Sequence, residues 1–371
     1  MTAYYTLTIG IPTWNRYQYL KDNIERLLAE IAKVPTLSIE IFVSDNASND
    51  ETQHYCEKLA QEHAFFCYHR NITNLGANAN FQNVLSLSHG DYVWMLGDDD
   101  LIAENCLSKI IHDIEQHQYP AIIIGGCIND LSQKRLYPPF ISHALLTDQT
   151  IIQRYDAIQL AGKISCLMFK RSEILPLLPK AWALITTLTS PWPHLIWLLM
   201  VLNKETKILF LPYCTNVFIE KNRFNMLQDG ISRTNIMIKS YAELIQELYT
   251  HGELHKDFYK LLLTSISHGR HSEFLKIVAY TTYMNRYRAT LRNAWLVLPI
   301  LPGLRNKAAF GIFYLLPVLL PTFIRKAVLQ LPCHLAPNRQ AHKDFIAYLK
   351  KAAALIAAKN NTRLVFDKDG L

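Results

Sequence analysis

Residues 92–100 read Tyr-Val-Trp-Met-Leu-Gly-Asp-Asp-Asp, an apolar run followed by a glycine and three adjacent carboxylates. A short apolar run of this kind predicts a buried strand, with the carboxylates at its carboxyl end. Three neighbouring carboxylates repel one another, and a divalent cation such as Mg²⁺ or Mn²⁺ compensates such a cluster. The alternative interpretation is a solvated acidic turn that caps a helix beginning near Ala103.

Strand and helix patterns alternate on both sides of this run, over the first 126 residues. Short connections between alternating elements predict an α/β fold, with a mostly parallel sheet covered by helices on both faces. The expected strands are Leu7–Ile11, Ile39–Val43, Phe65–His69, Tyr92–Leu96 and Ala121–Ile124, and the expected helices are Tyr17–Val34, Asp50 to about Glu62, Ala79–Ser88 and Ala103–Gln116.

Polar clusters follow four of the expected strands, at residues 12–16, 45–50, 71–80 and 97–100. Ligands of such sheets bind beyond the carboxyl ends of the strands, so these clusters are expected to open onto one crevice. Asp45 is placed there to accept hydrogen bonds from a base or a ribose, although an Asx turn explains it equally. Gly76 permits close backbone approach to a ligand, and an ordinary polar loop is the alternative.

Four motifs in this order resemble the signatures of the family 2 glycosyltransferases, which share the Rossmann-like GT-A fold. They are Ile-Pro-Thr-Trp-Asn-Arg (11–16), Val-Ser-Asp-Asn-Ala-Ser-Asn-Asp (43–50), Asn-Leu-Gly-Ala-Asn-Ala-Asn (74–80) and Leu-Gly-Asp-Asp-Asp (96–100). The resemblance covers roughly residues 5–220. The Gly-Asp-Asp-Asp form is closest to the branch that includes abequosyltransferase-like enzymes of surface-polysaccharide biosynthesis.

The resemblance implies a role for residues of each motif. Many members of the family carry Asp-X-Asp-Asp, and Gly97 stands where their first Asp falls, so the resemblance assigns a divalent metal, Mn²⁺ or Mg²⁺, to Asp99 and Asp100. Asp98 is then expected nearer the ribose. The residues expected to bind the nucleotide sugar are Pro12, Thr13, Arg16, Asp45, Asn74, Gly76, Asn80, Asp98 and Asp99.

The catalytic base is expected at His194. The family usually has an Asp or Glu there, opening a helix, but residues 190–200 of this chain contain no carboxylate. A neutral imidazole can accept a proton from an acceptor hydroxyl near pH 7. A histidine packed between Trp192 and Trp197 is the structural alternative, and Glu173 and Asp156 are the reserve candidates.

The C-terminal third differs in character from the rest of the chain. Basic residues dominate between Asn285 and Ala352, where Asp344 is the single acid. Residues 308–324 carry no charge, but they are too short and too interrupted by prolines to span a bilayer as one helix. A membrane-contacting segment over about residues 294–335 is therefore expected, with a buried helical hairpin as the alternative.

These observations predict a glycosyltransferase domain over residues 1–228 and a helical region over 229–371. The expected enzyme is an inverting, metal-dependent sugar transferase. It would use a UDP-, GDP-, dTDP- or CDP-linked sugar and a glycan or lipid-linked oligosaccharide acceptor, on the cytoplasmic face of the inner membrane. A sugar nucleotidyltransferase and a non-catalytic membrane-associated scaffold of the same fold are the alternatives. The seven scattered cysteines and the basic region predict neither a disulfide framework nor a nucleic-acid partner.

Overall fold

A computed structural model describes residues 5–34, 39–116, 119–124, 127–128, 144–146, 162–188, 192–202, 208–211, 216–218, 241–267, 291 and 295–330. The chain forms two compact units. The first comprises Met1–Glu220 and Thr250–Phe258, and the second comprises Lys221–Tyr249 and Tyr259–Leu371. The expected division at residue 228 differs from this one by eight residues and by the short 250–258 segment, and the functions assigned to the two parts stay predictions.

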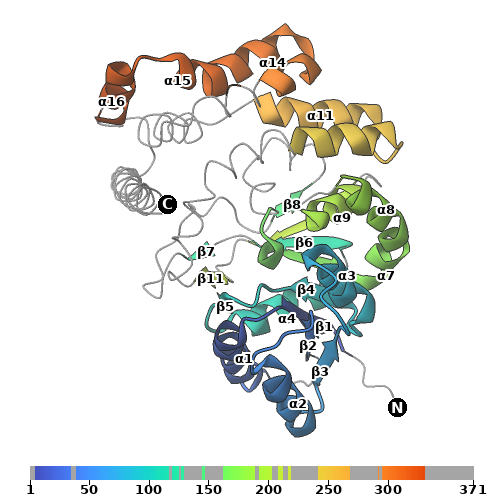
Figure 1. Cartoon of the computed structure of the whole chain (residues 1–371). Coiled ribbons are helices and arrows are strands. Elements are labelled where there is room, and N and C mark those ends of the chain that lie inside the picture. The colour runs from blue at the N-terminus through green and yellow to red at the C-terminus, as the bar shows by residue number, and fades with distance from the viewer. Residues whose placement is uncertain are drawn as a thin grey trace, which may run out of the picture. The chain divides into compact units, whose positions relative to one another are not determined.

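The first unit is built on an eight-stranded mixed sheet with the order β3-β2-β1-β4-β9-β6-β10-β8. The strands β3, β2, β1 and β4 are parallel, and β9 runs antiparallel to both β4 and β6 (Figure 1). The expected α/β class with a mostly parallel core is confirmed. The strands are β1 (Leu7–Thr13), β2 (Ile39–Asp45), β3 (Phe66–Arg70), β4 (Tyr92–Met95), β6 (Ala121–Ile124), β8 (Ala144–Leu146), β9 (Leu167–Lys170) and β10 (Ile208–Leu211).

Successive residues of β1 face opposite sides of the sheet, and different helices cover the two sides. Leu7, Ile9 and Ile11 point into the main apolar core together with α1, α2 and α4. Gly10 faces the other way, and a Cβ there would lie 2.2 Å from a methyl carbon of Val84 in α3. Only a glycine therefore lets α3 lie this close to the strand. The helices are α1 (Tyr17–Ile31), α2 (Thr52–Glu62), α3 (Ala77–Leu87) and α4 (Cys106–Gln116).

The strand β1 is longer than its sequence predicts. The expected end was before Pro12, but β1 continues through Thr13 and pairs with β2 along its whole length. The pairing with β4 stops at Gly10, so Pro12 lies where β1 has a single neighbour. A proline without an N–H group is tolerated at such an edge position.

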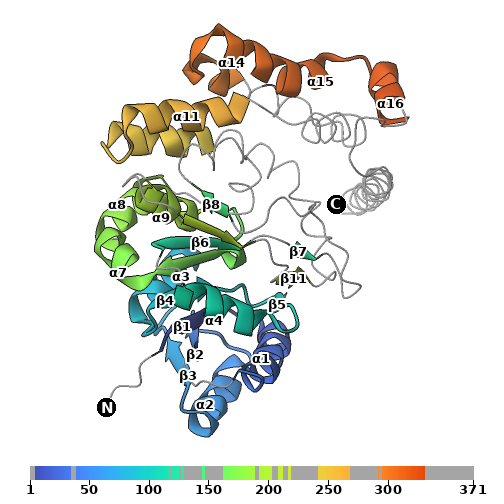
Figure 2. The same cartoon turned by 180° about the vertical axis from the view of Figure 1, so that it is seen from behind.

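The rest of the first unit completes the sheet and adds a smaller one, as Figure 2 shows from behind. The three-stranded sheet has the order β5-β11-β7, and its central strand is antiparallel to β5. Helix α8 packs on α9, and Phe169 of β9 contacts Trp197 of α9 edge-on. The remaining elements are β5 (Asp100–Ile102), β7 (Cys127–Ile128), η1 (Ile164–Cys166), α7 (Arg171–Ile174), η2 (Leu175–Leu177), α8 (Leu178–Leu188), α9 (Pro193–Leu202) and β11 (Asn216–Phe218).

The described part of the second unit is helical. Residues 241–250 form a helix, and α11 (Lys256–Ser267) follows it along the chain. Further along the chain, the short η4 (Leu298–Ile300) comes before a longer helical stretch. In that stretch, α14 (Gly303–Phe310), η5 (Gly311–Leu315) and α15 (Leu316–Leu319) follow one another without a break. The chain turns at Leu320 before α16 (Thr322–Gln330). Among the described residues, none of the helices has the length and apolarity that crossing a bilayer requires.

Candidate active site

The carboxyl ends of β1, β2 and β4 meet at one edge of the sheet and bring the expected site residues together. Thr13 ends β1, and its hydroxyl donates to Asp98 Oδ2 at 2.9 Å. Arg16 follows β1 and donates from Nη1 to Asp98 Oδ1 at 2.6 Å. Both oxygens of Asp98 are thus held by residues of the first motif. Segments more than eighty residues apart form one polar cluster, as the strand-end positions predicted.

Arg16 is shared between two carboxylates. Its Nη1 lies 3.3 Å from Asp99 Oδ2 as well as 2.6 Å from Asp98. The Arg16 side chain is 41% exposed and that of Asp98 is 5% exposed, with Asp99 between them at 27%. One guanidinium charge therefore offsets part of the repulsion in the acidic triplet, and it is placed where an anionic ligand can reach it.

The pKa of the Asp98 carboxyl is raised to about 6. Burial is the largest cause because it disfavours the charged form. The Arg16 charge lowers the pKa, the Asp99 charge raises it, and the hydrogen bonds from Thr13 and Arg16 lower it. A carboxylate that is costly to ionise in the free protein is suited to a site where a ligand supplies additional positive charge.

The raised pKa of Asp98 predicts a pH-dependent stability of the metal-free protein. The folded-state pKa of about 6 exceeds the ordinary value of 3.8. The stabilising effect of protonation is therefore complete below pH 3.8 and is lost as the pH rises through 6. We expect the wild type to gain about 2 kcal/mol in unfolding free energy relative to Asp98→Asn between pH 7 and pH 4. Urea unfolding of both proteins in EDTA would measure it, and a constant difference between them would contradict the prediction.

Gly97 and Ser165 organise the other carboxylate, Asp100. The Ser165 hydroxyl donates to Asp100 Oδ2 and accepts from the Gly97 N–H at 2.9 Å. Asn23 of α1 donates to the carbonyl oxygens of Gly97 and Asp100, at 3.0 and 2.5 Å. The motif loop is therefore fixed from two sides, by α1 and by the segment that leads into β9. Sequence reasoning did not single out Asn23 or Ser165 because nothing local marks them.

The carboxylates beside Gly97 fit a divalent cation. A Cβ on Gly97 would lie 3.4 Å from Asp99 Oδ1, 3.3 Å from Asp100 Oδ2 and 3.2 Å from Ser165 Oγ. Two carboxylate oxygens therefore border one small space, which a side chain at position 97 would crowd. Mg²⁺ and Mn²⁺ take oxygen ligands and commonly use one or two carboxylates together with substrate phosphates. The donor set agrees with the expected metal at Asp99 and Asp100, although that assignment stays a prediction.

Asp45 ends β2 and is fully buried. Its Oδ1 accepts from the Ser48 N–H at 2.9 Å, which is the turn that its sequence context predicted. Its Oδ2 accepts from the Tyr68 hydroxyl at 2.7 Å and lies 3.5 Å from Arg70 Nε. The structure therefore shows that Asp45 shapes the loop, and its contact with a base remains a prediction.

Asn80 connects the ends of β1 and β2 to helix α3. The Ser44 hydroxyl and the Asn71 amide donate to Asn80 Oδ1, at 2.7 and 3.2 Å. Asn80 Nδ2 donates to the backbone oxygens of Ser44 and Thr13, at 2.9 and 3.4 Å. Asn80 is 3% exposed, so all four contacts are protected from water. The residue holds the strand ends in place from inside the protein.

Asn74 and Gly76 form the turn in front of α3. Asn74 Oδ1 accepts from the Gly76 N–H at 2.8 Å and from Asn46 Nδ2 at 2.7 Å. Gly76 has φ of 84°, which favours glycine, and nothing lies within 4 Å of the position that a Cβ would take. The space beside Gly76 is open, and the approach of a ligand to its backbone stays a prediction.

His194 lies in the interior at the start of α9. The residue is 3% exposed, and among the described residues no group lies in hydrogen-bonding position to either ring nitrogen. Burial lowers its pKa to about 4, and the Gly162 backbone offsets only part of this shift. The ring is therefore neutral at pH 7 but weakly basic. Its role as the base stays a prediction, as does that of Glu173 in α7, and Asp156 lies outside the described residues.

Comparison with known proteins identifies relatives of the first unit. Residues 8–176 match the model of the family described as Glycosyl transferase family 2. A stretch of 103 residues is 42% identical to abequosyltransferase RfbV of Salmonella typhimurium and covers 28% of this chain and 30% of that protein. A stretch of 123 residues is 28% identical to the GalNAc(5)-diNAcBac-PP-undecaprenol beta-1,3-glucosyltransferase of Campylobacter jejuni, covering 33% and 38%. The matches thus span roughly a third of these relatives' lengths.

Solved structures extend the likeness in fold over most of the chain. S. aureus TarS 1-349 in complex with UDP superposes with a TM-score of 0.51 at 14% identity, over 83% of this chain and 89% of that one. The same protein in complex with UDP-GlcNAc gives a TM-score of 0.52 with the same coverage. At this identity the likeness shows the GT-A fold alone. Together with the four strand-end motifs, the match to the family model over residues 8–176, a little under half of the chain, gives this part of the chain its similarity to glycosyl transferase family 2.

Proposed function

We propose that the chain is an inverting glycosyltransferase that moves a sugar from a nucleoside diphosphate to a hydroxyl group of a glycan acceptor. The observation that carries the proposal is the convergence of Thr13, Arg16 and the acidic triplet Asp98–Asp100 at one sheet edge. A cationic group and carboxylates beside one another suit a ligand that carries both phosphates and a metal. The match of residues 8–176, which include these side chains, to the glycosyl transferase family 2 model supports this proposal.

Each group at the sheet edge has a chemical task in this reaction. Asp99 and Asp100 would hold a divalent cation, which when bound neutralises the charge that develops on the leaving diphosphate. Arg16 is half-exposed beside them and would donate to the same phosphates. Asp45, Asn74, Gly76 and the buried Asn80 would shape the pocket for the nucleoside. In-line attack by the acceptor hydroxyl would invert the anomeric centre, with His194 as the proposed base.

The donor and acceptor classes are proposed from the relatives. TarS, which shares the fold, has been solved with UDP and with UDP-GlcNAc, and this supports a nucleoside diphosphate sugar. The Campylobacter jejuni relative acts, by its name, on an undecaprenol-linked glycan, and this supports a lipid-linked acceptor in surface-polysaccharide assembly. We place the enzyme at the cytoplasmic face of the inner membrane for the same reason.

A panel of nucleotide sugars tests the proposal. Purified chain with Mn²⁺ would be mixed with UDP-, GDP-, dTDP- and CDP-linked sugars, and thermal stabilisation and slow donor hydrolysis would be measured. We expect at least one donor to raise Tm and to be hydrolysed, both abolished by EDTA. Stabilisation without hydrolysis or transfer by any donor would favour the non-catalytic scaffold, and release of pyrophosphate from a nucleoside triphosphate and a sugar phosphate would favour the nucleotidyltransferase.

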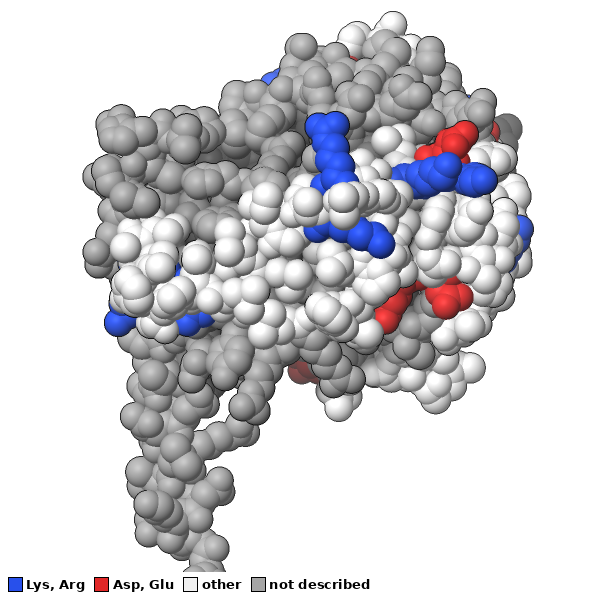
Figure 3. All heavy atoms as spheres, turned by 90° about the horizontal axis from the view of Figure 1, so that it is seen from above, with Lys and Arg blue, Asp and Glu red and all other residues white. Residues whose placement is uncertain are grey.

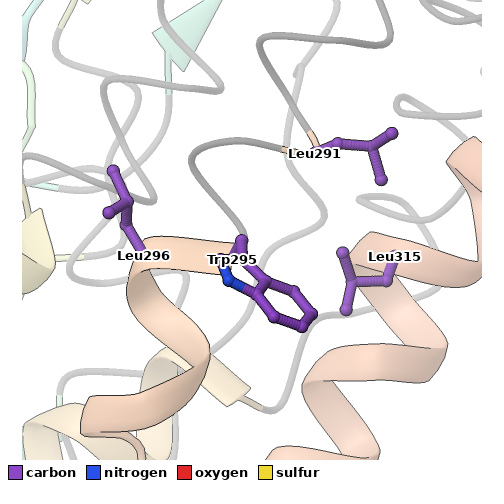
Figure 4. Close-up of a pocket in the computed structure, with 4 residues that line it drawn as sticks. All are labelled: Leu291, Trp295, Leu296 and Leu315. Carbon is purple, nitrogen blue, oxygen red and sulfur yellow. The ribbon is translucent and has the colours of Figure 1, made fainter.

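An exposed apolar stripe in the second unit supports contact with a membrane surface. Leu304, Ile312, Leu316 and Leu319 are spaced by multiples of about one helical turn along the continuous helix from Gly303 to Leu319, and they are 84%, 54%, 43% and 66% exposed. Figure 3 shows this region from above, largely uncharged and crossed by Lys and Arg side chains. Beside it, Leu291, Trp295, Leu296 and Leu315 line an apolar cavity of about 420 Å³ (Figure 4).

Replacing two residues of this stripe is expected to release the protein from membranes. Each Leu side chain that enters the apolar layer contributes about 1.5–3 kcal/mol. We therefore expect Leu316→Glu/Leu319→Glu to lower partitioning onto anionic vesicles by at least ~100-fold, measured by co-sedimentation. Leu87→Glu, an equally polar change at a 39% exposed residue of the other unit, is the control. Unchanged partitioning of the double variant would contradict membrane contact through this stripe.

A further inference from the structure

Three potential metal ligands of different chemistry meet at the amino edge of the sheet, opposite the candidate active site. Glu40 is the second residue of β2, Cys67 is the second residue of β3, and His89 lies in the turn between α3 and β4. Their ligand atoms all lie within 4.8 Å of one another. Asp45 is the last residue of the strand in which Glu40 is the second, so these two carboxylates are about 16 Å apart along β2.

The cluster is built around a buried carboxylate. Glu40 is fully buried, and its Oε2 accepts from the Thr8 hydroxyl and from the His89 N–H at 3.0 Å. Its Oε1 lies 2.6 Å from His89 Nδ1. The Gly90 N–H donates to Thr8 Oγ1 at 2.8 Å and fixes that hydroxyl in turn. One carboxylate oxygen is thus held by the scaffold, while the other faces the histidine.

The three side chains of the cluster differ in how far solvent reaches them. Glu40 is buried, Cys67 is half-buried and His89 is 59% exposed at its side chain. The ring therefore lies on the solvent side of the cluster and provides an entry path for an ion. Burial, and then the hydrogen bond and charge of Glu40, raise the pKa of the Cys67 thiol to about 12, so the thiol keeps its proton in the metal-free protein.

We propose that Glu40, Cys67 and His89 bind a divalent cation of the Zn²⁺ type through Glu40 Oε1, Cys67 Sγ and His89 Nδ1. Zn²⁺ accepts all three kinds of ligand atom, a thiolate sulfur, an imidazole nitrogen and a carboxylate oxygen, and it is usually four-coordinate, so water from the exposed side would complete the shell. Mg²⁺ and Mn²⁺ prefer oxygen ligands alone. The two edges of the sheet therefore select different ions: an oxygen-liganded ion at Asp99 and Asp100, and a thiolate-liganded ion here.

Binding requires one small movement and the loss of one proton. The 2.6 Å separation of His89 Nδ1 from Glu40 Oε1 must open to about 3.3 Å for both atoms to coordinate one ion. The exposed ring can make this movement while Thr8 holds the other Glu40 oxygen. The Cys67 thiol proton leaves to solvent, and the proton on His89 Nδ1 moves to Nε2. Binding of the ion to the protein with a neutral His89 therefore releases one proton in total. Affinity for the ion is therefore expected to rise with pH.

A bound ion would join the starts of β2 and β3 to the turn after α3. These segments are far apart along the chain, and an ion that binds only the folded arrangement stabilises it by mass action. We expect Zn²⁺ at a hundredfold excess over its Kd to raise the Tm of the EDTA-treated chain by roughly 5 °C or more. Mn²⁺ alone is expected to give no comparable shift.

Cobalt spectroscopy tests the proposal independently of any turnover. The full-length chain would be treated with EDTA, cleared of the chelator and titrated with Co²⁺, which substitutes for Zn²⁺ and gives a thiolate-to-metal charge-transfer band. We expect one Co²⁺ per chain, a band that Zn²⁺ bleaches, no band in Cys67→Ser and at least ~10-fold weaker binding in His89→Ala.

Matched controls separate this site from the rest of the molecule. His112→Ala, at an exposed histidine of α4, and Asp99→Asn, at the other edge of the sheet, are both expected to keep the band. The metal-free Tm of each variant would be measured first to show that it folds. Absence of the band in the folded wild type, or its persistence in folded Cys67→Ser, would overturn the proposal.

Discussion

Asp99→Asn is expected to lower sugar transfer at least ~1,000-fold, which corresponds to about 4 kcal/mol of lost transition-state stabilisation. Asp99 has the more exposed side chain of the motif's first two carboxylates, and its Oδ1 borders the space beside Gly97. The amide is nearly the same size, so packing is kept while the charge that would hold the cation is removed. Initial rates with the best donor, and Mn²⁺ binding in the presence of the nucleoside diphosphate, would measure the two effects.

Glu57→Gln is the matched control for this substitution. Glu57 lies on α2, is exposed and accepts a hydrogen bond from Gln53, far along the chain from the acidic triplet. We expect its rate and its Mn²⁺ binding to stay within about twofold of the wild type, as is usual for a surface change. A rate for Asp99→Asn within tenfold of the wild type would rule out a central role for this carboxylate.

Asn80→Ala is expected to destabilise the first unit by about 3 kcal/mol, or roughly 6–12 °C in Tm. The substitution removes four contacts at once and leaves the carbonyl oxygens of Ser44 and Thr13 without this donor in a buried position. Because Thr13 also holds Asp98, donor binding is expected to weaken together with stability. Thermal unfolding and donor titration would report the two losses separately.

Asn83→Ala provides the comparison on the same helix. Asn83 is less than one turn after Asn80, is partly exposed and donates one bond, to Asn71 Oδ1 at 2.9 Å. We expect a loss of about 1 kcal/mol or less. Equal effects of the two substitutions would mean that Asn80 acts only as part of α3 and does not hold the strand ends.

Much of the parallel half of the sheet was predictable because its signals are local. Apolar runs closed by polar turns located β1 to β4 and β6 to within two residues, and the largest differences are at the carboxyl ends of β1 and β2, which each extend two residues further than expected. The acidic triplet was correctly placed beside Thr13 and Arg16 because parallel strands end at one edge. These features depend on neighbouring residues and on one topological rule.

The remaining features depend on pairing between distant segments. The strand β9 lies between β4 and β6 and runs in the opposite direction to both, and nothing in its own sequence predicts this placement. The same holds for β5, a strand of three residues that pairs with the distant β11. Burial of His194 on all sides was weighed as an alternative, and it follows from packing of α9 against β9 and α8 rather than from the sequence around it.

The reversed direction of β9 has a consequence for how such a protein can diversify. A parallel strand presents its last residues to the ligand edge, whereas β9 presents the segment that enters it, with Ser165 touching Gly97 and Asp100. Ser165 therefore reaches the acidic loop from a segment that is not part of the strand–helix alternation of the first 126 residues. Substitutions in the short segment that leads directly into β9 would change what contacts the acidic loop without changing the order of the strands. The acidic loop can therefore change through this entering segment while the ends of β1, β2 and β4 keep their positions.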